Sequence, residues 1–565
     1  MTRVREFNEI KREARLWLER CSDNELLSEL SEISTDEARL SDAFYRHLEF
    51  GTGGLRGVLG VGTNRMNIHT VTRATLGIAS YIKAEGLTRV AAIGYDTRRY
   101  SKEFAERVAV TLAEEGIKAY IYSEPLPTPM LSYAVRSLGA SVGIMITASH
   151  NPAEYNGYKV YGRDGCQITD KAAERILAEI ESHGYFDGKG GSLSEHIGRG
   201  SAEYISESVF DDFISAVEST SVRDDSELDL SVGIVYTNLN GTGIRPVSHI
   251  LKKRGYKSLS FVREQMAHDG AFPTCPYPNP EIPEALSLGI AELSRRGADI
   301  LIATDPDCDR VGVAVREGRS TRILTGNEVG ILLFDYILEA RRERGSMPKR
   351  PVAVKTIVTT DLAERIAKKH NVTVKNVLTG FKYIGETVGE LEKHGRASDY
   401  VFGFEESCGY LSSSYVRDKD GVFAAYLVAE MAAYYKKQGK SLSDRLSEIY
   451  REHGYSVTEL RSYAFGGADG FKKMQSIMDA FRDNNPTPCG ISLKKAVDYL
   501  EGVDGLPVSN VLKLHYEGAS LTARPSGTEP KLKLYVYAEG KDEAEARERC
   551  ALIFKEAEAL IHSFS

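Results

Sequence analysis

Three stretches of the chain repeat one order of elements: an apolar strand, a polar loop, an amphipathic helix and a second strand. They begin near Val90, Val232 and Val352, at a spacing of about 120 to 140 residues. In the first stretch, Ser101 is expected to cap a helix that ends at Gly116. This alternation predicts related α/β units, in which helices cover a largely parallel sheet.

The chain has 565 residues, which is too long for one core, and about 100 to 200 residues per domain favours about three to five domains. The hydrophobic share of 42% and the charged share of 27% allow each domain to bury a core. We expect four domains, at residues 1–207, 208–322, 323–438 and 439–565. The last should contain a strand over Leu532–Tyr537 and a final helix from Lys541 to about Ile561.

A formal net charge of −8 argues against nucleic-acid binding, so any phosphate site must be a local basic pocket. The seven cysteines are scattered and show no Cys-x-x-Cys spacing, which favours a reducing compartment. The N-terminus has no apolar signal core, and no apolar run reaches the roughly 18 residues that span a bilayer. We expect a cytoplasmic protein without a membrane partner.

The segment Thr147–Pro152 follows the apolar run Val142–Ile146. It places the hydroxyl of Ser149 where a buried strand meets a loop, a common position for a catalytic nucleophile. Serine, histidine and asparagine before a proline also form ordinary turns. The segment alone therefore leaves both interpretations open.

A second polar segment, Asp305–Arg310, follows the apolar run Ile300–Ala303 and has aspartates at alternate positions. Carboxylates this close repel one another unless a cation lies among them, and hard oxygen ligands suit Mg²⁺. A calcium-binding hand needs a longer loop with glycine sixth and glutamate twelfth. The spacing of glycine and glutamate after Asp305 does not match such a loop. A solvated acidic turn is the remaining alternative.

Two further segments have the chemistry of ligand loops. Arg524–Lys531 combines a guanidinium, hydroxyls and a glycine, which together can hold a phosphate. Gly403–Ser407 places two carboxylates and a hydroxyl after a short apolar approach, and carboxylates can accept hydrogen bonds from sugar hydroxyls. Each could also be an ordinary turn or a charged surface loop.

Taken in order, these segments resemble the phosphoserine, metal, sugar and phosphate loops of the α-D-phosphohexomutase superfamily. The resemblance extends over nearly the whole chain and includes Gly51–Gly57, Thr379–Gly385 and Arg417–Gly421. It is greatest for the phosphoglucomutase-2 branch, which includes bacterial phosphoglucomutases often labelled phosphomannomutase. The resemblance implies an α/β fold of three related mixed α/β domains plus a smaller α+β C-terminal domain, around a central cleft.

The resemblance also implies roles for individual residues. Ser149 would carry the phosphoryl group, and Arg310 would add a positive contact beside the metal. Magnesium would be held by a phosphoserine oxygen on Ser149 and by Asp305, Asp307 and Asp309. Sugar binding and its recognition loop would use Gly380, Lys382, Glu405 and Ser407. The phosphate that is not reacting would be held by Arg524, Ser526, Gly527 and Thr528.

Proton transfer is the least specified part of the site. Lys159 and Lys419 match family positions with general base and acid roles, and Arg56 and His150 match other active-site positions. A lysine acts as a base only where burial or nearby cations lower its pKa. Plain phosphate binding or loop packing is therefore an equal alternative for each of these residues.

The activity that the resemblance implies is that of a phosphoglucomutase, with Mg²⁺ as cofactor and glucose 1,6-bisphosphate as activator and intermediate. Phosphomannomutase, phosphopentomutase and glucose-1,6-bisphosphate synthase are alternatives on the same scaffold. An intact Ser149 and the aspartates argue against a non-catalytic sugar-phosphate sensor, and a phosphatase would leave the sugar and phosphate loops without a purpose. The expected partners are small sugar phosphates, with the protein as a monomer or homodimer.

Overall fold

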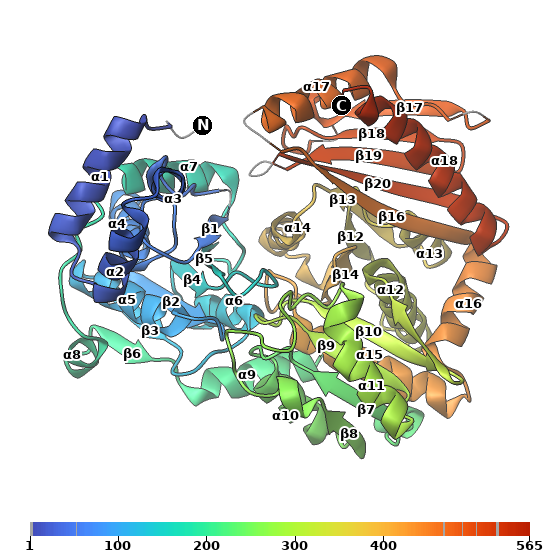
Figure 1. Cartoon of the computed structure of the whole chain (residues 1–565). Helices are drawn as coiled ribbons and strands as arrows, with labels where there is room; N and C mark the ends of the chain where they lie inside the picture. Colours follow the sequence, from blue (N-terminus) through green and yellow to red (C-terminus); the bar gives the residue numbers. More distant parts are fainter. Residues whose placement is uncertain are drawn as a thin grey trace.

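A computed structural model describes residues 4–51, 53–466, 469–488, 490–503, 505–526 and 530–564. Within these ranges the chain forms four sheets, each with its own helices. The four units follow one another in an arc, so that the first and the last face each other (Figure 1). The expected fold class is therefore confirmed.

The first unit begins with a layer of helices that packs around the buried Trp17 and Phe44. Its sheet has the order β1-β5-β4-β2-β3-β6. The strands are β1 (Gly54–Val58), β2 (Val90–Tyr95), β3 (Lys118–Ile121), β4 (Val142–Ile146), β5 (Tyr155–Gly162) and β6 (Ala202–Tyr204). The helices are α1 (Phe7–Arg20), α2 (Asn24–Ile33), α3 (Glu37–Phe44), α4 (Ile68–Ala84), α5 (Ser101–Glu114), α6 (Thr128–Ser137), α7 (Asp170–Glu181) and α8 (Leu193–Gly198).

Burial on both faces explains the continuous apolar runs of this sheet. Ile144 and Ile146 of β4 belong to the core formed with α4, α5 and α7. Met145, between them, joins the core on the other face with α6 and α9 (Glu207–Glu218). Successive strand residues point to opposite faces, so every residue of β4 is buried.

The expected helix cap at Ser101 is wrong. Helix α5 begins at Ser101, but its N-cap is Tyr100, whose backbone is left-handed with φ 61°. The hydroxyl of Ser101 donates instead to Asp96 Oδ1 at 2.7 Å. The Ser101 hydroxyl is therefore used by the carboxylate of Asp96, which follows β2, and does not cap the helix.

The second and third units repeat the first, with a parallel core and an antiparallel strand beside it. The second sheet, β11-β10-β9-β7-β8, contains β7 (Gly233–Thr237), β8 (Ser258–Phe261), β9 (Ile300–Thr304), β10 (Val311–Glu317) and β11 (Ser320–Leu324), with helices α10 (Ile244–Arg254) and α11 (Ser287–Arg296). The third, β13-β12-β14-β15, contains β12 (Val352–Thr356), β13 (Thr373–Val377), β14 (Tyr400–Glu405) and β15 (Gly409–Leu411). Its helices are α12 (Gly326–Glu343), α13 (Leu362–Lys369), α14 (Phe381–Lys393) and α15 (Gly421–Lys437).

The fourth unit follows α16 (Leu442–His453) and has an antiparallel sheet in the order β16-β20-β19-β18-β17. Its strands are β16 (Tyr455–Ala464), β17 (Leu493–Asp498), β18 (Leu512–Tyr516), β19 (Ala519–Pro525) and β20 (Lys531–Gly540), and its helices are α17 (Gly470–Asn484) and α18 (Glu543–His562). No helix in the described ranges has both the length and the apolarity needed to cross a bilayer.

Candidate active site

The first three units present a turn at the same place in their sheets, where a parallel strand meets its antiparallel neighbour. Ser149 lies between β4 and β5, residues Asp305–Arg310 lie between β9 and β10, and Glu406–Cys408 lie between β14 and β15. Each turn contains a non-glycine residue in the left-handed region: Ser149 (φ 52°), Cys308 (φ 50°) and Cys408 (φ 62°). Such backbone is costly for these residues and is often found at functional sites.

The Asp305–Arg310 turn of the second unit contacts residues of both the first and the third unit. Ser149 Oγ donates to Asp305 Oδ2 at 2.8 Å, and Lys159 of β5 donates to Asp307 Oδ2 at 2.8 Å. From the third unit, Lys419 Nζ lies 2.8 Å from Asp309 Oδ2. The structure therefore brings together the serine, the three aspartates and the two lysines that the sequence singled out.

Arg98 holds the Ser149 turn through its backbone. Its guanidinium donates to the carbonyls of Ser149 at 2.5 Å, Pro152 at 2.8 Å and Tyr155 at 3.1 Å, and also to that of Asn151. The side chain is fully buried and pairs with Asp96, Nε to Oδ2 at 3.4 Å. Arg98 thus fixes the position of Ser149 without touching its hydroxyl.

The three aspartates form a compact acidic cluster. Each is almost fully buried, and one carboxylate oxygen from each lies within 4.8 Å of those of the other two. Among the described residues, Asp307 Oδ1 and Asp309 Oδ1 have no hydrogen-bond partner. Buried carboxylate oxygens without donors are suitable ligands for a hard divalent cation such as Mg²⁺.

The charges in this cluster shift its ionisation in opposite directions. Burial and the neighbouring Asp309 and Asp307 raise the pKa of Asp305 well above its usual value. Burial would also raise that of Asp307, but Lys159 outweighs it and holds the pKa low. Burial opposes the charge of Lys159, but Asp307 and Asp309 outweigh it and raise the lysine pKa. In this geometry, therefore, Lys159 is protonated.

Several cationic and neutral groups surround the cluster. Burial, Arg310 and Arg56 lower the pKa of His150 well below its usual value, so the imidazole is neutral. Its Nδ1 lies 3.3 Å from Ser149 Oγ. Arg310 forms an ion pair with Glu281. Arg56 lies on β1, where it is exposed and paired in register with Gly157 of β5.

The third turn brings Glu405, at the end of β14, close to the cluster. Glu405 Oε1 accepts a hydrogen bond from the backbone N–H of Gly380 at 2.8 Å, and Gly380 has a φ of 116° that favours glycine. Burial raises the pKa of Glu405 to about 7, although Lys419 opposes the shift. Ser407 follows in the same turn. Glu406 accepts from Thr356 and Thr359, both at 3.1 Å, which fixes it to β12 and the turn after it.

Lys382 of the third unit binds residues of the first unit. Its ammonium donates to Asp170 Oδ1 of α7 at 2.8 Å, so it joins the third unit to the first. The backbone carbonyl of Lys382 accepts from Cys166 Sγ at 3.3 Å. These contacts place the segment that contains Gly380 and Lys382 against the first unit.

The expected phosphate loop lies at the end of the β19–β20 hairpin. Arg524 pairs in register with Lys533, and the backbone N–H of Ser526 donates to the carbonyl of Lys531 at 2.7 Å. Burial, Arg524 and Lys531 lower the pKa of Lys533, as expected for a concentration of positive charge. Gly527 and Thr528, which the sequence also singled out, lie outside the described residues.

Tyr535 connects this cationic hairpin with the third unit. It packs in a cluster with Ile357, Val358 and Leu378. Burial and then Glu406 raise its pKa, while Arg524 opposes the shift. The cationic end of the fourth unit therefore faces the Glu406–Cys408 turn of the third.

Four family descriptions match the chain in order. They are phosphoglucomutase/phosphomannomutase alpha/beta/alpha domain I at residues 47–185, domain II at 211–318, domain III at 325–453, and the C-terminal domain at 474–556. The fold and the converging turns define the class of an α-D-phosphohexomutase. The chain belongs to the phosphoglucomutase/phosphomannomutase family, which confirms the resemblance seen in the sequence.

Relatives and solved structures agree with this placement. A phosphoglucomutase from Staphylococcus haemolyticus (strain JCSC1435) is 37% identical over 506 residues, covering 87% of this chain and 90% of the relative. One from Staphylococcus aureus (strain MSSA476) is 36% identical over 537 residues, covering 92% and 94%. The crystal structure of a putative phosphomannomutase from Thermus thermophilus has a TM-score of 0.69 at 25% identity, covering 91% of this chain and 99% of that one.

Proposed function

We propose that the protein is a phosphoglucomutase that interconverts glucose 1-phosphate and glucose 6-phosphate, with phosphorylated Ser149 as the phosphoryl donor. The observation that carries the proposal is the contact of Ser149 Oγ with Asp305 at 2.8 Å, within a site to which the third unit contributes Lys419 and Glu405. Relatives at 36–37% identity over most of the chain are named phosphoglucomutase, which supports this choice of sugar.

The proposed reaction has two transfers. The phosphoryl group leaves Ser149 Oγ and bonds to the free sugar hydroxyl, whose proton passes through the site to Ser149 Oγ, so that glucose 1,6-bisphosphate forms. The sugar turns over in the site, and its other phosphoryl group transfers to Ser149 Oγ, whose proton passes to the sugar oxygen that is freed, which releases the isomeric monophosphate. Arg98 keeps Ser149 in place through both transfers, since it binds the carbonyls of the turn.

Asp305, Asp307 and Asp309 would hold Mg²⁺, because their oxygens are buried, close together and partly without donors. The metal would draw negative charge from the transferring group. Around that group we propose that Lys159 and Lys419 carry protons and that Arg56 neutralises charge. His150 would contact Ser149 as a neutral imidazole, and Arg310 would add a positive contact beside the metal.

Sugar recognition is proposed for Glu405 and Ser407, with Gly380 and Lys382 shaping the loop beside them. Arg524 and Ser526, with Gly527 and Thr528 beyond the described residues, would hold whichever phosphate is not reacting. We further propose a cytoplasmic protein, monomeric or homodimeric. The buried free cysteines of the described ranges support a reducing compartment.

The proposal is tested by comparing the 1-phosphates of glucose, mannose and ribose in coupled assays, with and without glucose 1,6-bisphosphate. We expect the highest kcat/KM for glucose 1-phosphate and a stimulation by the bisphosphate, which phosphorylates Ser149. A higher value for mannose or ribose would assign another mutase of the same scaffold. Release of inorganic phosphate at the rate of substrate loss would instead indicate a phosphatase.

Glu405→Gln should separate activity from stability. An ordinary glutamate ionises near pH 4.5, whereas burial raises the pKa of Glu405 to about 7. The folded protein therefore loses stability relative to the unfolded chain as pH rises through this window, and glutamine, which does not titrate, avoids the loss. In metal-free buffer, the difference in melting temperature, variant minus wild type, should increase as pH rises from about 4.5 to 7.

Turnover of the same variant at pH 7.5 should fall about 10-fold or more in both directions, because a charged hydrogen bond contributes about 1.5 to 3 kcal/mol. Glu386→Gln, an exposed change on α14, is the matched control and should leave both quantities unchanged. Parallel melting curves for Glu405→Gln and wild type across the pH range would contradict the raised pKa. Unchanged turnover would remove Glu405 from the sugar site.

A further inference from the structure

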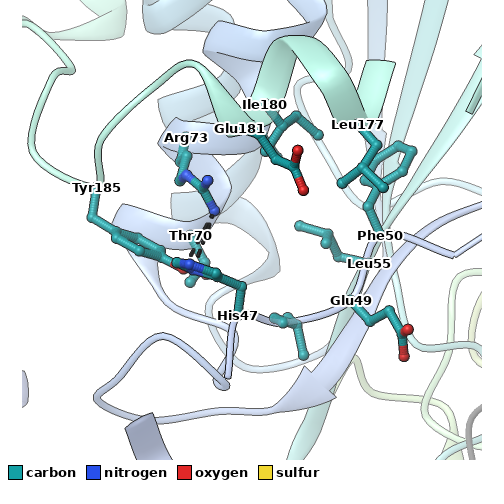
Figure 2. Close-up of a pocket in the computed structure, with 12 residues that line it drawn as sticks. His47, Glu49, Phe50, Leu55, Thr70, Arg73, Leu177, Ile180, Glu181 and Tyr185 are labelled. Carbon is teal, nitrogen blue, oxygen red and sulfur yellow. Dashed lines mark hydrogen bonds between the residues drawn. The ribbon is translucent and has the colours of Figure 1, made fainter. Parts of the chain in front are cut away.

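A cavity of about 200 Å³ lies in the first unit (Figure 2), and none of the residues that line it belongs to the converging turns. It is enclosed by helices α4 and α7 and by the segment that leads into β1. Leu55 of β1 lines it, whereas the next residue, Arg56, points to the opposite face of the strand. The cavity is therefore separated from the active site by β1.

One wall of the cavity is apolar. It is formed by Phe50 and Leu55 together with Leu177 and Ile180 of α7, and Figure 2 shows these side chains gathered on one side of the space. An apolar wall favours a ligand with a hydrocarbon part, because its burial removes apolar surface from water.

Arg73 of α4 lies on the opposite wall and is held rigidly. Its Nε donates to the carbonyl of His183 at 2.7 Å, and its guanidinium carbon lies 4.9 Å from the ring centroid of Tyr185. Within the described part of the chain, the contacts of Nη1 are long, 3.4 Å to Tyr185 Oη and 3.5 Å to His47 Nδ1. A fixed guanidinium with weakly used donors is prepared for an anionic group.

His47 does not accept a hydrogen bond from the Arg73 guanidinium. Its Nε2 lies 3.1 Å from Nη2 of Arg5, and its Nδ1 lies 2.5 Å from Tyr185 Oη. Burial, Arg5 and Arg73 lower its pKa to about 4, so the imidazole is neutral and has one N–H. Because Nε2 must accept from Arg5, the proton is assigned to Nδ1, which then donates to Tyr185 and cannot accept from Arg73.

Glu181, the last residue of α7, supplies the opposite charge. Its carboxylate points into the same space as the Arg73 guanidinium (Figure 2). Among the described residues no ion pair joins the two, and Glu181 takes part in none of the ion pairs found. A cation and an anion therefore line one cavity without neutralising each other.

We propose that this cavity binds a free α-amino acid with an aliphatic or aromatic side chain. The ligand carboxylate would accept the forked donors of Arg73, its ammonium would pair with Glu181, and its side chain would lie on Phe50, Leu55 and Leu177. A phosphate ester would place a dianion beside Glu181 and Glu49, both of which line the cavity. An uncharged apolar molecule would leave Arg73 and Glu181 unpaired.

The test is calorimetric titration of the full chain with L-leucine and L-phenylalanine. Two analogues each lack one charge: 3-methylbutylamine has no carboxylate, and 4-methylpentanoate has no ammonium. We expect saturable binding of at least one of the two amino acids, and each analogue should bind about 10-fold or more weakly, since it loses a charged contact. Binding should persist in saturating glucose 1,6-bisphosphate, because the two sites are separate.

Two variants assign the binding to the cavity. Glu181→Gln changes an exposed side chain and should weaken amino-acid binding about 10-fold, while Glu174→Gln, exposed on the same helix but outside the cavity, should bind as the wild type does. The proposal is overturned if neither amino acid gives saturable heat at millimolar concentration. It is equally overturned if Glu181→Gln binds normally, or if the bisphosphate displaces the amino acid.

Discussion

Mutase turnover should fall by about 1,000-fold or more when Ser149 is replaced by alanine, because the proposed phosphoryl carrier is then absent. The loss should be equal with glucose 1-phosphate and glucose 6-phosphate as substrate, since both directions pass through the same serine. Incubation with glucose 1,6-bisphosphate should phosphorylate the wild type on Ser149, and peptide mass analysis should find no phosphate there in the variant.

A second substitution separates chemistry from folding. Ser149 has a left-handed backbone with φ 52°, and glycine adopts this conformation without steric cost. Ser149→Gly should therefore fold at least as well as the wild type and be as inactive as the alanine variant. Ser182→Ala, at an exposed serine of the same unit, should keep full activity. Wild-type turnover in either Ser149 variant would exclude the serine as carrier.

Asp307→Asn should lower kcat by about 100-fold or more, because it removes a charge from the proposed metal site. Asparagine has nearly the same shape, so the packing around the buried side chain is kept. The change also removes the ion pair with Lys159, whose Nζ lies 2.8 Å from the carboxylate. Steady-state kinetics over a range of Mg²⁺ concentrations should show both a lower maximum and a higher requirement for the metal.

Chelation gives an independent measurement of the same site. Removal of divalent cations from the wild type should abolish turnover, and added Mg²⁺ should restore it. Asp211→Asn, at an exposed position of α9, is the matched control and should respond to chelation as the wild type does. Full activity in chelator would show that the acidic cluster has no metal role in the reaction.

The sequence predicted the parts of the site that are local in the chain. Ser149 and the three aspartates each follow an apolar strand directly, so strand burial alone placed them at one edge of a sheet. Their meeting could be predicted only through the family resemblance, because the contact of Ser149 with Asp305 joins residues 156 positions apart. The catalytic roles of Lys159, Lys419, Arg56 and His150 stay predictions.

Other features had no signal of this kind. Arg98 donates to backbone carbonyls 51 to 57 positions away. Every residue has a backbone carbonyl, so the residue types give no sign of these contacts. The available clue to the role of Arg98 was its position two residues after Asp96, directly after a strand. The cap at Ser101 was mispredicted because Asp96, a tertiary partner, competes for its hydroxyl. Lys382 likewise finds Asp170 only once two units have docked.

The placement of the three turns has a consequence for how the chain can be divided. Each unit has its own sheet, but the first three share one hydrophobic core, and none contains both the serine and the acidic cluster. A proteolytic fragment or separately expressed unit would therefore have no complete reaction centre and would expose apolar surface that the neighbouring units bury. The smallest functional piece of this protein includes at least the first three units, and catalytic competence is a property of the docked assembly.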